Sequence, residues 1–332
     1  MRLPKFEYLR AGSVEEACAM LVDESTTALP MAGGSDLLVA MKQGIATPER
    51  LVDLGGIPGL DAIVEREGTL RIGALATLRK IADSPLVQQQ WPLLAQAARR
   101  AASPQIRNLA TIGGNVCLSR RCWYYNQSRF WRQSRPPCLR MGGAQCYVVA
   151  GSDKCYALHC ADTVPPLLAL EAKVKLVSAS GERIVALDDL YSDLGPDAIH
   201  LKPGEILTEV LVPQPPSSGF GVYLRYSDRP SISFPLAGVA AIVKRGRGGE
   251  ECEDARVAVG AVCPKPLRLR RGEEVLRGQK LNRAVISEFV ETAAREVKPI
   301  PYIYHLPEHK RRVVRNLLLE AVEKAWQETK SC

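Results

Sequence analysis

In the first part of this chain, some short segments carry apolar residues at helical spacing and others carry them at strand spacing. Residues 13–16 (SVEE) form a capping box, in which the Ser13 hydroxyl can accept from the third helical N–H while Glu16 reaches back. Residues 18–22 then supply an apolar face, so a helix is predicted as the first element. Residues 50–54 predict a short strand after it.

The same reading continues along the middle of the chain. Alternating residues 70–74 predict a strand, and Thr77 is placed to cap the helix that follows. Residues 93–102 predict a second helix, which ends near Ser103-Pro104 because proline disfavours helical backbone before it. Residues 173–177 alternate as a strand does.

A proline-rich segment at 213–218 (PQPPSS) is the clearest linker. Residues 239–243 and 257–262 after it predict buried strands. Two helices are predicted at the end, over about 283–297 and 313–326, the second with apolar residues at helical spacing. Strands and helices mixed in this order predict an α/β protein with a separate C-terminal part.

Composition limits the class of protein. The 332 residues are 46% hydrophobic and 24% charged, as in ordinary globular proteins. No run of about 18 apolar residues occurs, so no membrane segment is expected. The N-terminus lacks the apolar core of a signal peptide, which predicts a cytoplasmic protein. In a reducing cytoplasm, clustered cysteines are more often metal ligands or redox groups than disulfides.

Cysteines and positive charge gather in one segment. Six of the ten cysteines fall within residues 117–160, together with seven basic residues and one acidic residue. This segment therefore carries six of the net eight positive charges, and the remainder is nearly neutral. A protein that coats nucleic acid would spread basic residues over a domain face, so that class is disfavoured. The four histidines are scattered, and no catalytic side chain is predicted.

Two paired-glycine turns are candidate ligand sites, at residues 32–36 (AGGSD) and 111–115 (TIGGN). Glycine pairs let backbone N–H groups approach a ligand, and consecutive N–H groups form a nest that suits a pyrophosphate. Neither turn matches the Rossmann or the Walker pattern. Taken singly, each is equally typical of a tight turn beside a strand.

The full set of motifs resembles a known family. The motifs are residues 32–38 (AGGSDLL), 72–77 (IGALAT), 107–108 (RN), 111–115 (TIGGN), 161–162 (AD), 167–170 (LLAL), 204–207 (GEIL) and 223–225 (YLR). In this order and spacing they resemble the FAD-binding domain or subunit of the xanthine dehydrogenase family of molybdenum enzymes. The resemblance implies a mixed α/β FAD-binding domain over 1–216, with subdomains of about 1–56 and 57–216, and a smaller α/β domain over 217–332.

The resemblance also implies a set of FAD-binding residues. Both glycine turns would hold the pyrophosphate, and Thr77 and Asp162 would contact the flavin half. Arg225 stands where a lysine near the flavin ring is common, which keeps the charge and changes its shape. The implied residues are Leu29, Pro30, Met31, Ala32, Gly33, Gly34, Ser35, Asp36, Thr77, Thr111, Ile112, Gly113, Gly114, Asn115, Asp162 and Arg225.

An insertion of about residues 117–160 departs from xanthine dehydrogenase, and 46 residues separate Asn115 from Asp162. It resembles the extra loop of 4-hydroxybenzoyl-CoA reductases and of some bacterial aldehyde oxidoreductases, in which four cysteines bind a [4Fe–4S] cluster. The match implies four ligands, with Cys117 and Cys160 as spare cysteines. These ligands are Cys122, Cys138, Cys146 and Cys155. A zinc ion bound by four cysteines is the alternative.

The leading functional hypothesis is an FAD and [4Fe–4S] electron-transfer subunit of 4-hydroxybenzoyl-CoA reductase, which removes the phenolic hydroxyl to give benzoyl-CoA. The expected partners are a molybdenum-cofactor subunit and a [2Fe–2S] subunit, in a dimer of heterotrimers, with ferredoxin as electron donor. An alternative is the medium FAD subunit of an aldehyde or N-heterocycle oxidoreductase. A zinc-stabilised nucleic-acid-binding protein is a further alternative, because arginines and aromatic residues interleave in the insertion.

Overall fold

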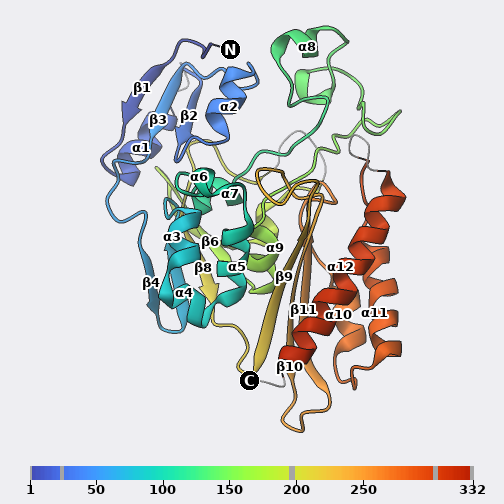
Figure 1. Cartoon of the computed structure of the whole chain (residues 1–332). Helices are drawn as coiled ribbons and strands as arrows, with labels where there is room; N and C mark the ends of the chain where they lie inside the picture. Colours follow the sequence, from blue (N-terminus) through green and yellow to red (C-terminus); the bar gives the residue numbers. More distant parts are fainter. Residues whose placement is uncertain (1, 23–25, 194–198, 302–305, 330–332) are drawn as a thin grey trace.

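The chain folds around three separate β-sheets (Figure 1). The computed structural model describes residues 2–22, 26–193, 199–301 and 306–329. Helices flank the sheets, so the mixed α/β class predicted from the sequence is confirmed. No helix among these described residues is long and apolar enough to cross a membrane.

The first sheet is parallel, with strand order β1-β3-β2, and its strands are β1 (Glu7–Arg10), β2 (Ala28–Met31) and β3 (Arg50–Asp53). Helix α1 (Val14–Leu21) begins at the predicted cap, where the Ser13 hydroxyl accepts from the Glu16 N–H at 3.1 Å. The prediction that a helix comes first is wrong, because β1 precedes it. This strand is mostly exposed and lacks a buried apolar alternation, so only its pairing with β3 defines it.

The second sheet is antiparallel, with order β4-β5-β8-β6-β7. Its strands are β4 (Ile63–Arg66), β5 (Thr69–Gly73), β6 (Lys173–Ser178), β7 (Gly181–Ala186) and β8 (Ile206–Pro213). The helices around it are α3 (Leu78–Asp83), α4 (Pro85–Gln90), α5 (Pro92–Arg100), α6 (Pro104–Arg107), α7 (Ile112–Val116) and α9 (Val164–Ala169), with the 3-10 turn η2 (Asp188–Leu190). Apolar side chains of this sheet and these helices share one core.

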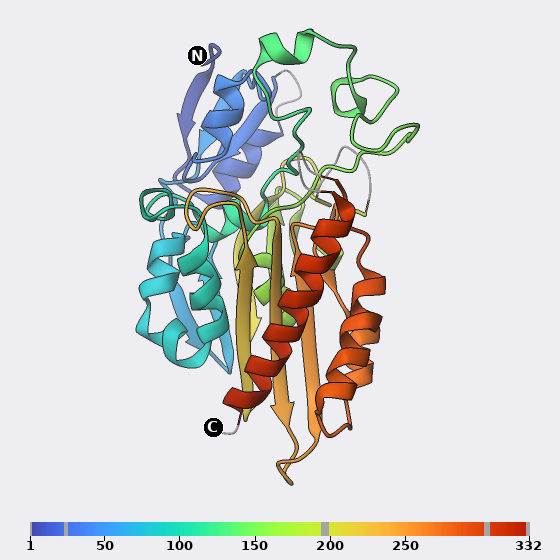
Figure 2. The same cartoon turned by 45° about the vertical axis from the view of Figure 1, so that its right-hand side comes forward.

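The third sheet lies after the proline-rich linker and is antiparallel, with order β12-β11-β10-β9. Its strands are β9 (Gly219–Tyr226), β10 (Ala237–Arg245), β11 (Cys252–Gly260) and β12 (Leu267–Arg268). Three helices pack on it, namely α10 (Arg270–Leu276), α11 (Arg283–Glu296) and α12 (Pro307–Glu328) (Figure 2). Strand β10 is almost wholly buried between its neighbours, as its apolar sequence predicts.

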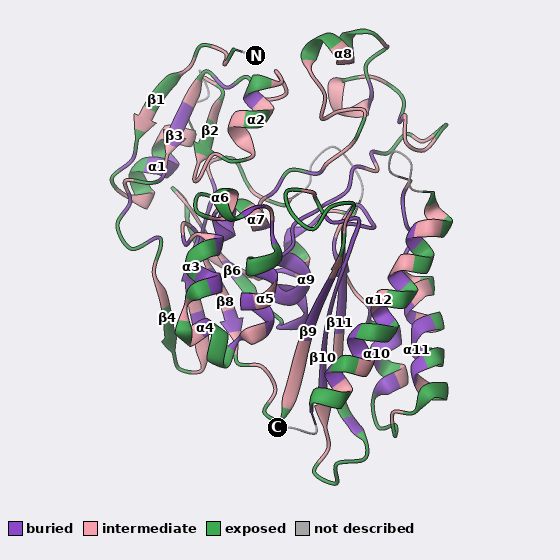
Figure 3. Cartoon of the chain, in the orientation of Figure 1, coloured by how far each residue is buried: buried purple, intermediate pink, exposed green. Residues whose placement is uncertain are grey.

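The cysteine-rich insertion stands apart from these layers, above the middle and C-terminal sheets in Figure 1. Its regular structure is limited to α8 (Arg129–Gln133) and the 3-10 turn η1 (Leu139–Met141). Its surface is largely exposed or half-buried (Figure 3). A segment with so little regular structure depends on specific cross-links for its order.

An ion pair at the β7 edge of the second sheet gives a pH-dependent stability. Glu205 has a side chain only 3% exposed and accepts from Arg183 at 2.7 and 2.8 Å, and this hydrogen bonding lowers the pKa of Glu205. A lowered carboxyl pKa stabilises the fold above the unfolded-state pKa, and the contribution is lost as pH falls through the folded pKa. We expect Glu205→Gln to lower the unfolding temperature at pH 7, with the difference from wild type shrinking between about pH 5 and 3. A constant difference across that range would contradict the assignment.

Candidate functional site

The two glycine turns lie against each other. A β-carbon added to Gly33 would stand 1.7 Å from the carbonyl oxygen of Leu109, just before the second turn. In the second turn, a β-carbon on Gly113 would stand 2.8 Å from the Ala74 side chain, at the end of β5. Glycine is therefore required at both positions for backbone to approach backbone. Motifs separated by about 80 residues of sequence thus converge on one place in the fold.

The first turn presents backbone donors that the protein itself does not use. The backbone of Gly34 is left-handed, with φ +67°, and α2 (Leu37–Lys42) begins directly after the turn. Within the described part of the chain, the N–H groups of residues 33–36 have no hydrogen-bond acceptor. Consecutive free N–H groups after a left-handed glycine suit an oxyanion such as a phosphate. This arrangement fits the expected role in holding a pyrophosphate.

The second glycine motif is a short helix, α7, and the prediction of a turn is wrong here. The Thr111 hydroxyl caps this helix by accepting from the Gly114 N–H at 3.1 Å. The N–H groups of Ile112 and Gly113 donate at 2.9 Å to the carbonyls of Ala76 and Ala74. These donors are therefore occupied, so they do not form a second anion nest. The motif instead fixes the position of its neighbour, the first turn.

Thr77 and Asn115 also belong to this junction. Thr77 pairs with Thr111 in an isolated antiparallel bridge, and its hydroxyl caps α3 by accepting from the Lys80 N–H at 3.1 Å. The amide oxygen of Asn115 accepts from the Thr163 hydroxyl at 2.7 Å. Both residues tie the glycine motifs to neighbouring segments, and Asn115 connects them to the segment that carries Asp162.

Asp162 is the centre of a buried polar group. Its Oδ1 atom accepts from the Tyr223 hydroxyl at 2.9 Å and from the Arg225 Nε at 2.7 Å. Burial raises the pKa of Asp162, and the Arg225 guanidinium opposes the rise. Arg225 also donates to the Ser227 hydroxyl and the Ser233 carbonyl, so its fork is fully engaged. Arg225 thus holds Asp162 in place. The family resemblance, in which this position is commonly a lysine near the flavin ring, did not predict this role.

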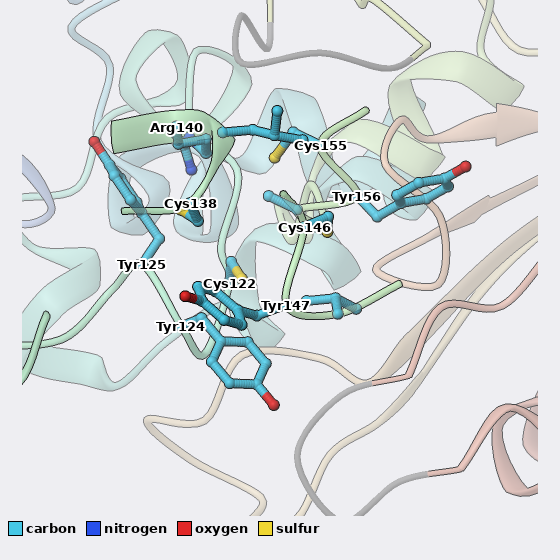
Figure 4. A pocket seen from close by; sticks show the side chains of 12 residues that line it. Cys122, Tyr124, Tyr125, Cys138, Arg140, Cys146, Tyr147, Cys155 and Tyr156 are labelled. Atoms are coloured by element: carbon cyan, nitrogen blue, oxygen red, sulfur yellow. The ribbon is translucent and has the colours of Figure 1, made fainter. Parts of the chain in front are cut away.

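The four cysteines expected as ligands line one cavity inside the insertion (Figure 4). Cys122 precedes α8, Cys138 directly precedes η1, and Cys146 and Cys155 lie in the irregular segment of bends and turns that follows. Residues of the same segment complete the wall, including Tyr124, Tyr125, Arg140, Tyr147, Tyr156 and Ala157. Aromatic side chains thus form part of the wall, and solvent exposure is one of the factors that set the potential of an iron–sulfur centre.

Burial and nearby polar groups act in opposite directions on the thiols of this cavity. Burial raises the pKa of Cys122 to about 11, and the N–H groups of Tyr124 and Tyr125 oppose the rise. Burial also raises the pKa of Cys155, and the Ala157 N–H and the Arg140 guanidinium oppose it. The raised pKa values keep the free thiols of Cys122 and Cys155 protonated at neutral pH, so a bound metal would have to displace their protons. Hydrogen bonds to cluster-bound sulfur are a common means of tuning an iron–sulfur centre.

Single-ion geometry is not present at these cysteines. Among the residues that the structure describes, no group of three or more His, Cys, Asp or Glu side chains could hold a metal ion. A zinc ion needs four sulfurs about 2.3 Å from one point. The four thiols line a common cavity without forming such a group.

The spare cysteines lie elsewhere. Cys117 packs against the core of the second sheet, and Cys160 lies in a small apolar cluster with Leu158 and Ile300. Burial raises the pKa of Cys117 to about 12 and that of Cys160 to about 11. Neither lines the cavity, so the structure separates the six clustered cysteines into four and two.

Sequence reasoning missed Tyr223 as part of the buried polar group and missed two arginines of the insertion. Arg121 forms an ion pair with Asp36 of the first turn at 2.7 Å, and Arg132 donates to backbone carbonyls after α2. The only local signal was the excess of arginine in the insertion. His159, one of the four scattered histidines, is buried against Tyr191, and burial lowers its pKa to about 4.

Comparisons with known proteins agree with this geometry. A family described as the FAD binding domain in molybdopterin dehydrogenase matches residues 4–215, and the CO dehydrogenase flavoprotein C-terminal domain matches residues 222–325. The chain belongs to the FAD-binding subunits of the xanthine dehydrogenase and CO dehydrogenase type of molybdenum hydroxylases. The family resemblance inferred from the glycine motifs is therefore confirmed.

Individual relatives of this family extend over almost the whole chain. The chain is 34% identical to the aldehyde oxidoreductase FAD-binding subunit PaoB of Escherichia coli, over 82% of this chain and 86% of that protein. It is 29% identical to the nicotine 6-hydroxylase medium subunit of Paenarthrobacter nicotinovorans, over 99% and 100%. A crystal structure of the Cu,Mo-CO dehydrogenase superposes with a TM-score of 0.82 at 27% identity, covering 98% of this chain and 99% of that chain.

Proposed function

We propose that this chain is the FAD and [4Fe–4S] electron-transfer subunit of a molybdenum-containing aldehyde or N-heterocycle oxidoreductase. FAD and the cluster would supply the one- and two-electron chemistry. The chain's own residues would bind the two cofactors, orient them and shield them from water. The observation that carries the cluster part is the convergence of Cys122, Cys138, Cys146 and Cys155 on one cavity.

The FAD part is supported by the family and by the free donors of the first turn. The N–H groups of residues 33–36 would bind the pyrophosphate, with Ser35 beside them. Asp162 is a buried carboxylate held in place by Tyr223 and Arg225. It would contact the flavin half of FAD. Leu29, Pro30 and Met31 form β2, which leads into this turn.

The cluster distinguishes this chain from the general family pattern. Neither matched family description mentions an iron–sulfur centre. The insertion supplies what such a centre requires, namely four thiols, N–H donors toward sulfur and positive charge at Arg140. A zinc-stabilised nucleic-acid-binding protein is disfavoured, because the chain belongs to a flavin-binding family.

The substrate class rests on the relatives. By their names, these proteins are subunits of enzymes that act on aldehydes and nicotine. We therefore place an aldehyde or N-heterocycle substrate ahead of 4-hydroxybenzoyl-CoA, whose reductase the insertion resembles. A molybdenum-cofactor subunit and a [2Fe–2S] subunit are the proposed partners. The basic insertion would suit an acidic electron carrier of the ferredoxin kind.

Anaerobic purification followed by flavin, iron, sulfide and zinc analysis tests the cofactors. We expect FAD together with about four iron and four sulfide per chain, the composition of one cubane cluster. Flavin without iron would remove the cluster from the proposal, and zinc without flavin would overturn all of it. Assays of the purified complex with aldehydes, N-heterocycles and 4-hydroxybenzoyl-CoA then decide the substrate.

Substitution of a proposed ligand should remove the cluster selectively. We expect Cys138→Ser to abolish the absorption and paramagnetic signals of the cluster, because three thiolates rarely retain a cubane. Cys160→Ser is the matched control, since Cys160 is similarly buried and lies outside the cavity. Iron content that falls equally in both variants would show that general destabilisation, and not ligand loss, causes the effect.

A further inference from the structure

Two arginines of the insertion hold opposite ends of helix α2, the short helix that follows the first glycine turn. At its beginning, Arg121 donates from Nη1 to the Oδ1 of Asp36 at 2.7 Å. At its end, Arg132 donates to the carbonyls of Gln43 at 3.2 Å and Gly44 at 2.6 Å. The insertion is thus connected to both termini of α2, although 85 or more residues of sequence separate the partners.

Arg121 is fixed at the base of the insertion. Its N–H and carbonyl pair with the backbone of Leu158 at 2.7 and 2.8 Å, which closes the insertion where the chain leaves and returns. The next residue is Cys122, the first proposed cluster ligand. The Arg121 guanidinium also lies 4.6 Å from the centre of the Phe234 ring. A displacement of Cys122 therefore moves the residue that binds Asp36.

Arg132 is fixed within the insertion. It lies on α8, its side chain is buried, and it also donates to the Gln127 carbonyl. A cation at the carbonyl end of a helix is favourable because it meets the negative end of the helix dipole. The planar fork lets one side chain reach several carbonyls at once. Beside it, the Arg129 side chain approaches Gly44 so closely that an added β-carbon there would lie 3.5 Å away.

Helix α2 in turn fixes the first glycine turn. The Leu38 N–H donates to the Gly34 carbonyl at 3.0 Å, and the Ala40 N–H donates to the Asp36 carbonyl at 3.0 Å. The free N–H groups of residues 33–36 therefore keep their direction only while α2 keeps its position. The two arginines bind both the residue that ends this turn and the residues that end the helix.

We propose that Arg121 and Arg132 are positioning residues that couple the two cofactor sites, so that an assembled cluster strengthens FAD binding at the first turn. This inference rests on the proposed function, because it requires both cofactors. The insertion has little regular structure of its own, so ligation at four cysteines is what would order it. An ordered insertion presents both arginines to α2, whereas a disordered insertion releases them.

Linkage makes the effect reciprocal. If the cluster raises the affinity for FAD by some factor, FAD raises the retention of the cluster by the same factor. Coupling between two sites in proteins typically changes affinity by roughly 5- to 150-fold. A loss of about tenfold in FAD affinity on removal of the cluster is therefore the expected size.

The test measures FAD affinity of the purified full chain before and after anaerobic removal of the cluster with an oxidant and a chelator. Flavin fluorescence gives the dissociation constant, and hydrogen exchange of peptides over residues 33–44 reports the turn and α2 directly. In the wild type we expect the dissociation constant to rise about tenfold and exchange over 33–44 to accelerate. Exchange in α11, on the far sheet, should stay unchanged.

Variants assign the coupling to the two arginines. In the double variant Arg121→Gln/Arg132→Gln, FAD binding should already be weak with the cluster present, and removal of the cluster should add little. Arg129→Gln is the control on the same helix: it removes the charge of an exposed arginine, keeps the Cβ and Cδ carbons that lie nearest Gly44, and leaves Arg132 in place. Arg121→Lys should keep much of the coupling through its charge on Asp36, whereas Arg132→Lys should not, because an ammonium cannot reproduce the fork.

Three results would overturn the inference. Unchanged FAD affinity and exchange after the loss of four irons would refute the coupling and leave the cofactor assignment intact. A double variant that still responds to cluster removal as the wild type does would show that other residues carry the coupling. Protein purified without iron or without flavin would overturn the proposed function, and the coupling with it.

Discussion

Gly33→Ala is expected to weaken FAD binding and to destabilise the protein strongly. The new β-carbon would stand 1.7 Å from the Leu109 carbonyl oxygen, a distance at which backbone has to move. Overpacking of well-packed sites costs about 1–3 kcal/mol and sometimes more, and a clash with backbone belongs at the upper end. The displacement separates the first turn from the segment before α7, so FAD affinity should fall roughly tenfold or more. Flavin content and thermal unfolding measure the two effects.

Gly248→Ala is the matched control for this substitution. A β-carbon there meets no atom within 4 Å, and the residue lies in the exposed turn between β10 and β11. We expect normal flavin content and an unfolding temperature close to that of wild type. If Gly33→Ala also retains FAD, the close approach of the two glycine motifs is not needed for the cofactor, and the assignment of the site is wrong.

Local sequence signals predicted the capped helices and most buried strands of this fold. Ser13 and Thr77 each accept from the N–H group three residues later in the chain, so the capping can be predicted from neighbouring residues alone. Strand β10 and the second half of β11 are rich in valine and alanine, and this apolar sequence predicts that they are buried. Paired glycines misled the prediction at α7, because Thr111 and tertiary hydrogen bonds to Ala74 and Ala76 override their preference for a turn.

The sequence predicted which residues belong to the candidate site, but not the contacts that these residues make with distant parts of the chain. The family motifs named residues 33–36 and Asp162, and the resemblance of the insertion to a known cysteine-bearing loop named the four cavity cysteines. The contacts of Arg121 with Asp36 and of Tyr223 with Asp162 join positions 85 and 61 residues apart. No local pattern encodes such pairs, because each is decided by how separate sheets and the insertion pack together. The roles of Arg121, Arg132 and Tyr223 therefore emerge only from the folded chain.

Asp162→Leu should be the most destabilising single substitution at the proposed FAD site. It leaves the Arg225 guanidinium, whose side chain is 5% exposed, without its carboxylate, and removes the acceptor of the buried Tyr223 hydroxyl. Breaking a buried ion pair from one side typically costs about 3–5 kcal/mol. We expect a large fall in unfolding temperature together with loss of FAD, measured by calorimetry and flavin absorbance.

A substitution in a second buried ion pair distinguishes loss of stability from loss of FAD binding. Glu273 and Arg268, with side chains 1% and 4% exposed, pair within the C-terminal sheet and helix α10, away from the glycine motifs. Glu273→Leu should also destabilise the fold strongly. The buried Arg268 then keeps only Glu171, at 3.3 Å, as a carboxylate partner, and the Val257 N–H loses its acceptor. It should nevertheless retain FAD below its unfolding temperature, whereas Asp162→Leu should not. Equal flavin loss in both variants would mean that stability alone governs the cofactor, and that Asp162 has no specific role at the flavin.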